Sequence, residues 1–276
     1  MKIVKHSGDV VDFNPKKLRN SLVRSGASEV VVQDILTRIE KEIYDGMPTK
    51  QIYKLAFGYL KKADNSHAAR YNLRQALQLL GPAGFFFEKY VARLFEAEKF
   101  DSRVNLILQG KCVAHEVDVM VRKNNVISMI ECKFHAGRDA TTDVKVPLYI
   151  FSRFNDLKEN QHLLFSGKER ISSCWIVTNN RFTSDAITFA TCSGMRLLSW
   201  DYPKDNNLRI RIDAKLLYPI TCLTTLSIAE KDKLLILDVI LVKEVINNSH
   251  CLEKIGLSPN RVKNVLKEAT MLCHSY

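Results

Sequence analysis

The stretch HEVDVMVRKNNVISMIECKFH, residues 115–135, decides the fold of the middle of the chain. It holds two strand-like apolar runs separated by Lys123-Asn124-Asn125. Asparagine tolerates the positive φ that a tight hairpin turn requires, so Asn124 and Asn125 are expected at the centre of the turn. Lys123 then faces Val126, and this pair fixes the register of a predicted β-hairpin.

Two carboxylates meet in this register. Asp118 lands directly opposite Glu131, and Lys133 shares a face with Glu131 because strand side chains alternate with a period of two. Facing carboxylates repel each other by up to about 1 kcal/mol. A divalent cation such as Mg²⁺ or Mn²⁺ removes this penalty, because hard cations take carboxylate oxygens as ligands. A neighbouring lysine can stabilise charge on a phosphoryl group or orient the attacking water, so the pattern predicts metal-assisted phosphodiester hydrolysis.

An ordinary surface hairpin is the alternative interpretation, with Glu131 and Lys133 forming a same-face ion pair. The neighbouring residues favour the functional interpretation, because the charges interrupt strands that are apolar at most other positions. Strands of this kind are expected to be covered on both faces, and charged side chains at such positions usually have a functional role. The apolar positions are Val117, Val119, Val121, Ile130, Cys132 and Phe134.

The whole chain is predicted to be a multidomain α/β (α+β) protein with three segments. Residues 1–80 open with a short strand–turn–strand and continue as helices. Residues 81–220 combine helices at 85–98, 142–156 and 184–193 with several strands, which indicates a mixed sheet flanked by helices. Residues 221–276 are helical. The stretch SIAEKDKLLILDVILVKEVI at 227–246 is expected to form one or two helices, and its apolar run LLILDVILV at 234–242 to be a buried helix.

Composition limits the class of protein. The 276 residues carry a formal net charge of +11, which favours a polyanionic partner such as nucleic acid. The seven cysteines form no CxxC pair, which argues against a zinc ribbon or a disulfide framework. No apolar run is long enough to span a membrane, and a cytoplasmic location without a membrane partner is expected.

The middle segment resembles the PD-(D/E)xK nuclease superfamily, and within it the Mrr-like restriction endonucleases. The resemblance rests on GFFFEKYVARLFEAEKF, HEVDVMV, ISMIECKFH and the later CWIVTNNRFTSDAITFATCSGMRLLSWD, and it covers roughly residues 84–202. It implies a restriction-endonuclease-like fold in which a helical acid, Glu88, joins Asp118 and Glu131 in holding one or two magnesium ions. Lys133 matches the lysine of the motif and would complete the catalytic set.

The N-terminal segment resembles the ATP-cone, a small nucleotide-sensing module. The resemblance rests on VKHSGDVVDFNPKKL at residues 4–18 and on the later HAARYNL. It implies binding of ATP or dATP near Lys5, His6, Gly8 and Lys17. Because the chain has no GxxxxGK(S/T) motif, the nucleotide is expected to regulate the protein rather than fuel it.

The C-terminal LEKIGLSPNRVKNVLKEA resembles a helix–hairpin–helix element. Such an element would direct backbone amides and a helix N-terminus toward a DNA phosphate without reading sequence. The residues implied are Gly256, Ser258, Arg261 and Lys263. A plain helical pair that packs on the rest of the protein, or on a second subunit, is the alternative.

Together these features predict a magnesium-dependent endodeoxyribonuclease acting on double-stranded DNA and regulated by an adenine nucleotide. Both family resemblances also imply a homo-oligomer. Two alternatives stay open: a non-catalytic, ATP-responsive DNA-binding regulator, and a structure-specific repair or junction nuclease.

Overall fold

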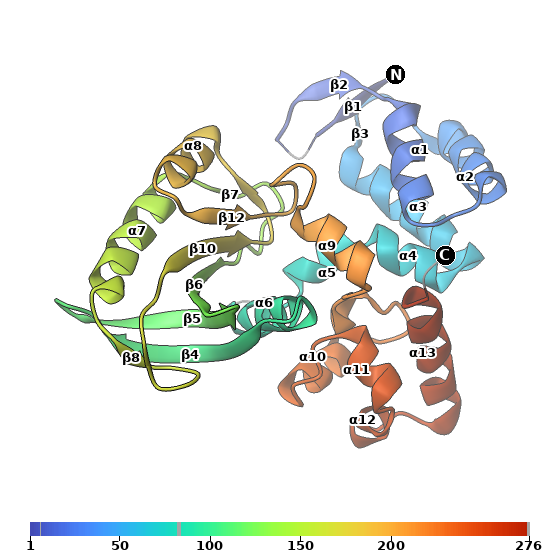
Figure 1. Cartoon of the computed structure of the whole chain (residues 1–276). Helices are drawn as coiled ribbons and strands as arrows, with labels where there is room; N and C mark the ends of the chain where they lie inside the picture. Colours follow the sequence, from blue (N-terminus) through green and yellow to red (C-terminus); the bar gives the residue numbers. More distant parts are fainter. Residues whose placement is uncertain (6, 82–83, 275–276) are drawn as a thin grey trace. The chain divides into compact units, whose positions relative to one another are not determined.

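The computed structural model describes residues 1–5, 7–81 and 84–274 (Figure 1). The chain forms two compact units. One combines residues 1–76 with 218–276, and the other contains residues 77–217. The first and last predicted segments thus contribute to one unit, with helix α5 (Leu73–Gln78) passing from it into the other.

The unit of residues 77–217 is built on a five-stranded mixed sheet with the order β12-β10-β6-β5-β4. Its strands are β4 (Asp101–Gln109), β5 (Ala114–Lys123), β6 (Val126–Lys133), β10 (Ser173–Thr178) and β12 (Arg196–Leu198). The first three form an antiparallel meander. Strands β10 and β12 run parallel to β6.

Helices lie on both faces of this sheet (Figure 1). Consecutive side chains of β6 and β10 are buried, as in strands that are covered on both faces. Met120, Met129 and Ile176 belong to a core shared with α7 (Lys145–Lys158) and α8 (Ser184–Cys192). On the other face Trp175 meets the ring of Phe95, which belongs to α6 (Phe85–Ala97), edge to face at 5.4 Å. The predicted mixed α/β fold is therefore confirmed.

Smaller elements complete this unit. Strand β7 (Thr141–Thr142) pairs in parallel with β11 (Arg181–Phe182), and β8 (His162–Leu163) forms a short hairpin with β9 (Lys168–Glu169). Helix α9 (Leu208–Lys215) follows the last strand of the large sheet and starts at Asn207, whose side chain caps the amide of Ile210.

The N-terminal part of the other unit has a small sheet and a group of helices. Strand β1 (Lys2–Val4) lies between antiparallel β2 (Val10–Asp12) and parallel β3 (Met47–Pro48). The helices are α1 (Pro15–Arg24), α2 (Glu29–Glu42), α3 (Thr49–Ala63) and α4 (Asn65–Tyr71). Asn14 caps α1, and Pro15 occupies its first turn, the residue types that favour these two positions.

The C-terminal part of this unit is helical, with a 3-10 turn at Ile220–Cys222. Its helices are α10 (Ile228–Ile236), α11 (Val242–Asn247), α12 (His250–Lys254) and α13 (Pro259–Leu272). The stretch at residues 227–246 forms two helices, α10 and α11, and not one continuous buried helix through residues 234–242. Helix α10 ends at Ile236, Asp238 adopts a φ of 62°, and Leu241 pairs in an antiparallel bridge with Pro219. Among the described residues no helix is long and apolar enough to cross a membrane.

Candidate active site

The β5–β6 hairpin has the turn and the register that its sequence predicts. Asn124 and Asn125 have φ values of 51° and 62°, and Lys123 pairs with Val126. The pairing continues to Val119 opposite Ile130, so the next residues along the two strands are Asp118 and Glu131. Both carboxylates therefore lie at the end of the hairpin away from the turn.

Burial and charge repulsion act on this carboxylate pair. Burial raises the pKa of the Glu131 carboxyl, and the negative charge of Asp118 raises it further. Burial also raises the pKa of Asp118, although a hydrogen bond of 2.7 Å from the Cys132 amide to its Oδ2 opposes the shift. The charge of Lys133 lowers the pKa of both carboxyls, so this lysine acts electrostatically on the same pair.

Helix α6 brings Glu88 toward the pair. Gly84, with a φ of 81°, lies at the helix start, and a Cβ built on it would lie 3.5 Å from Phe134 Cβ and 3.7 Å from Glu88 Oε1. Glu88 therefore lies beside the chain that leaves β6. Burial raises its pKa to about 7, with further contributions from the charges of Asp118 and Glu116. Glu88, which the sequence places mainly through the family resemblance, thus shares an electrostatic environment with Asp118.

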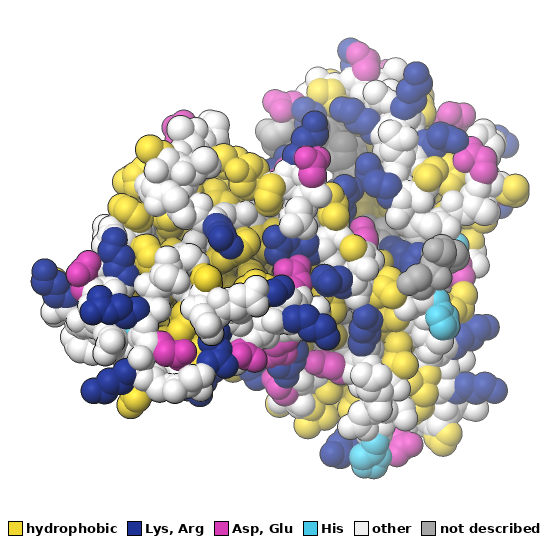
Figure 2. Space-filling view, viewed as in Figure 1, with side chains coloured by type: hydrophobic (Ala, Val, Ile, Leu, Met, Phe, Trp, Pro, Cys, Tyr) yellow, Lys and Arg dark blue, Asp and Glu magenta, His cyan; other side chains and the backbone are white. Residues whose placement is uncertain are grey.

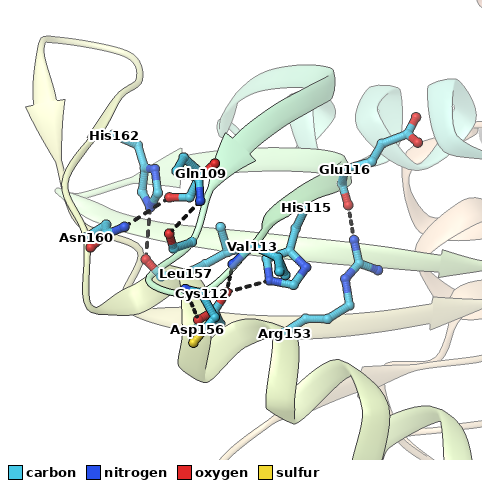
Figure 3. A network of polar contacts seen from close by, with 11 residues as sticks. Gln109, Cys112, Val113, His115, Glu116, Arg153, Asp156, Leu157, Asn160 and His162 are labelled. Carbon is cyan, nitrogen blue, oxygen red and sulfur yellow. Dashed lines mark hydrogen bonds and ion pairs between the residues drawn. The ribbon is translucent and has the colours of Figure 1, made fainter.

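Arg153, on α7, is the most important side chain of the site that the sequence did not reveal. Its Nη1 lies 2.8 Å from Glu131 Oε2, and only 11% of its side chain is exposed. Its Nη2 donates to the backbone carbonyl of Glu116 (Figure 3). The carboxylate of Glu116 points away from Arg153 in this view. The guanidinium also lowers the pKa of Asp118, so it serves as a counter-ion for both facing carboxylates.

A second α7 side chain ties the helix to the turn before β5. Asp156 accepts hydrogen bonds from the backbone amides of Cys112 and Val113 at 2.8 and 3.3 Å, and His115 Nε2 lies 2.8 Å from its Oδ2 (Figure 3). A Cβ on Gly110 would lie 2.1 Å from Asp156 Oδ2, so glycine permits this close approach. His115 is therefore part of the support for α7.

The chemistry of the donors fits a hard divalent cation. Glu88, Asp118 and Glu131 offer carboxylate oxygens, the ligands that Mg²⁺ and Mn²⁺ prefer, and a cation would relieve the repulsion that raises their pKa values. Within residues 1–5, 7–81 and 84–274, however, no three His, Cys, Asp or Glu side chains are grouped as metal ligands. Glu131 is paired with Arg153 instead, so binding of a cation would require this ion pair to rearrange.

The residues predicted to bind a nucleotide surround the first turn of the chain. The Lys5 amide donates to the Asp9 carbonyl at 2.9 Å, and Gly8, with a φ of 88°, donates to the Lys5 carbonyl at 3.0 Å. Lys17 is exposed in the first turn of α1. His6 lies outside the described residues.

The residues predicted to bind nucleic acid lie around the start of α13. Gly256 has a φ of 89°, and Ser258 is the residue before the helix. Lys263 is exposed. Arg261 pairs with Glu230 of α10 and donates to the Thr225 carbonyl at 2.8 Å, so in this structure it links two helices.

Lys and Arg side chains are scattered over much of the visible surface, consistent with the net charge of +11, whereas the upper left part of the view is mainly hydrophobic or uncharged (Figure 2). They are not gathered into one stripe in this view, and acidic side chains lie among them. On this face the basic side chains therefore do not define one binding surface.

Comparisons with known proteins define the family. An ATP cone domain model matches residues 1–75, and a model described as AF1548-like, C-terminal, matches residues 218–273. An uncharacterized protein of Archaeoglobus fulgidus is 33% identical over 180 residues, which cover 65% of this chain and 97% of the relative. The chain therefore belongs to the AF1548-like family and begins with an ATP-cone domain, as its N-terminal motif predicts.

A solved structure agrees with this assignment. The crystal structure of AF1548, a protein of unknown function, matches with a TM-score of 0.57 and 32% identity, over 68% of this chain and 97% of that one. Protein VC1899 from Vibrio cholerae matches at 18% identity with a TM-score of 0.32, over 72% of this chain and 52% of that one. Can2 from Sulfobacillus thermosulfidooxidans, in complex with cyclic tetra-adenylate, matches at 15% identity with a TM-score of 0.34, over 74% of this chain and 52% of that one. Similarity as low as in the last two carries no functional argument.

Proposed function

We propose that this chain is a metal-dependent deoxyribonuclease of the PD-(D/E)xK, Mrr-like type, which hydrolyses phosphodiester bonds of double-stranded DNA. The observation that supports the proposal is that Asp118 and Glu131 directly follow the last observed strand pair, Val119 and Ile130, and that the charge of Lys133 acts on both carboxyls. Half-buried Glu88 adds a third carboxylate, from the helix where the resemblance places one. Burying several carboxylates together costs free energy that a bound cation or another counter-charge offsets, and such clusters are typical of functional sites.

Each residue has a distinct role in this proposal. Glu88, Asp118 and Glu131 would hold Mg²⁺ or Mn²⁺. When bound, such an ion polarises the phosphoryl oxygen and lowers the pKa of a water ligand. Lys133, exposed at the end of β6, stabilises negative charge that develops on the phosphate or orients the attacking water.

The flanking parts would provide substrate contact and regulation. We assign nucleotide binding to the ATP-cone, with Lys5, His6, Gly8 and Lys17 near ATP or dATP. We assign DNA phosphate contact to the segment around Gly256, Ser258, Arg261 and Lys263, which requires Arg261 to exchange its pairing with Glu230 for a phosphate. Division into domains at residues 1–80, 81–220 and 221–276, self-association and a cytoplasmic location belong to the same proposal.

Plasmid cleavage tests the nuclease assignment. Purified protein with Mg²⁺ or Mn²⁺ is expected to nick or linearise plasmid DNA, and Asp118→Asn and Lys133→Ala are expected to lower the rate at least about 100-fold, the scale on which loss of transition-state stabilisation acts. Asp185→Asn and Lys168→Ala, exposed on α8 and β9, are the matched controls and should retain the wild-type rate. Equal cleavage by all five proteins would rule out the site.

The Arg153–Glu131 ion pair favours a second candidate, a non-catalytic ATP-responsive DNA-binding regulator, because Glu131 already has a counter-ion. DNA binding that responds to ATP, together with no cleavage in either metal, would support it. Preferential cleavage of branched DNA over plasmid would instead indicate a repair or junction nuclease.

A further inference from the structure

The contacts of Arg153 are those of a counter-ion to the Glu131 carboxylate. Its guanidinium joins two parts of the site: the Glu131 carboxylate on β6 and the carbonyl of Glu116 on β5. The side chains of Arg153 and Glu131 are 11% and 13% exposed, so water screens the pair only weakly. The ring of Tyr149, one helical turn earlier, lies 5.6 Å from the guanidinium carbon and covers it.

One donor of this guanidinium is unused. Arg153 Nε is buried and has no hydrogen-bond partner among the described residues. A buried donor without a partner costs about 1–3 kcal/mol, so this arrangement is not the best one available to an arginine. The guanidinium is therefore held by its contacts with Glu131 and the Glu116 carbonyl, while its Nε contributes no hydrogen bond.

The helix itself is fixed independently of the carboxylates. Asp156, three residues after Arg153, is held by two backbone amides and by His115 (Figure 3). These contacts anchor α7 at the turn that precedes β5 and would remain if the Arg153–Glu131 pair were broken. Arg153 can thus change partner without release of its helix.

We propose that Arg153 is a positioning residue that competes with the divalent cation for Glu131. In the metal-free protein it holds the facing carboxylates together, and by the same charge it lowers the affinity of the site for the cation. This inference rests on the proposed nuclease function, because it assumes that Glu131 and Asp118 are ligands.

The competition has a measurable signature. Removing the positive charge of Arg153 leaves Glu131 without its ion-pair partner, so the metal-free protein becomes less stable. The same change removes repulsion between Arg153 and a cation, so the cation binds more tightly, by about tenfold for a charge this close. A purely structural arginine would give the first effect without the second.

The test uses the full-length protein, with thermal melting in EDTA and calorimetric titration with Mn²⁺. Arg153→Met is expected to melt at a lower temperature in EDTA, to bind Mn²⁺ about tenfold more tightly than wild type, and to show a larger rise in melting temperature on addition of Mn²⁺. Arg153→Lys retains the charge and should restore an affinity near that of wild type. Arg181→Met, which breaks the exposed pair with Asp201, is the matched control and should not alter Mn²⁺ affinity.

The outcomes separate this inference from the proposed function. If wild-type protein does not bind Mn²⁺, or if Asp118→Asn binds Mn²⁺ as well as wild type does, the metal site and this inference both fail. If wild type binds Mn²⁺ through Asp118 but Arg153→Met binds no more tightly, only the inference about Arg153 fails. Should Arg153→Met not fold, Arg153→Gln removes the charge while retaining hydrogen bonding, and the same tightening is expected of it.

Discussion

At the scale of single residues, Asp156 shows how one acidic side chain can contribute to the stability of the fold. Two amides and His115 surround its carboxylate, and the side chain is 14% exposed. The hydrogen bond with His115 is the main cause that lowers the pKa of Asp156 to about 2. The charged form is therefore the one that the folded protein stabilises.

This lowered pKa predicts a pH dependence of stability. An Asp that titrates near pH 4 when unfolded and near pH 2 when folded stabilises the protein above pH 4, and the contribution is lost as the pH falls from about 4 to about 2. Asp156→Asn is expected to lower the melting temperature at pH 7 by a few degrees. The difference from wild type should shrink as the pH approaches 2. Melting curves at pH 7, 4 and 3 check this, and a constant difference across the three would contradict it.

Among single residues, the sequence reveals those whose partners lie on the same hairpin. Asp118, Glu131 and Lys133 were predictable together because the turn fixes the register of the residues between them. Arg153 was not, since it reaches Glu131 only because α7 crosses the sheet, and no spacing along the chain encodes that crossing. Glu116, whose charge raises the pKa of Asp118, could have been suspected from the sequence, because it lies two residues before Asp118 on the same strand and so on the same face.

On the scale of elements, the β5–β6 hairpin couples a local turn to the candidate site. Both central residues of the turn are in the left-handed region, which costs about 1–2 kcal/mol for a residue with a side chain other than asparagine or glycine. The register of Asp118 and Glu131 thus depends on residues at the opposite end of the strands. The turn could be predicted from the sequence because asparagine at both central positions strongly favours a tight turn.

Substitutions at Asn125 test this coupling. Asn125→Gly should keep or raise the free energy of unfolding by up to about 1 kcal/mol, because glycine adopts positive φ freely. Asn125→Val should lower it by about 1–2 kcal/mol, because β-branched residues are strained there. Urea unfolding measures both, and a lower stability of Asn125→Gly than of Asn125→Val would show that the turn conformation is wrong.

The run LLILDVILV shows where element prediction fails. Its apolar content fits a buried helix and a buried extended segment equally well, and hydrophobicity alone cannot choose between them. The chain uses both: Leu234 and Leu235 are buried on α10, whereas Ile240 and Leu241 are buried after the turn at Asp238. The extended conformation of the second half of the run is stabilised by the antiparallel bridge between Leu241 and Pro219, which is distant in the sequence.

On the scale of the whole molecule, the two ends of the chain form one compact unit. The Arg70 guanidinium donates to the carbonyl of Leu272 at 3.0 Å, and Lys61 donates to the carbonyl of Thr224 at the same distance. Thr221 Oγ1 donates to the carbonyl of Ala76 at 2.7 Å. Such long-range contacts have no local signature, and the sequence therefore did not indicate that residues 1–76 and 218–276 form one compact unit.

This organisation predicts which part of the molecule a nucleotide stabilises. A ligand that binds only the folded state raises its stability by about 2.7 kcal/mol at one hundred times its Kd. If ATP or dATP binds the ATP-cone, differential scanning calorimetry should show that the nucleotide raises the melting temperature of the unit of residues 1–76 and 218–276. Lys5→Ala combined with Lys17→Ala should abolish the shift, because the phosphate charge loses its counter-charges. Lys41→Ala with Lys54→Ala, two exposed lysines on α2 and α3, should retain it. An equal shift in both double variants would remove the basis for placing the nucleotide at the first turn.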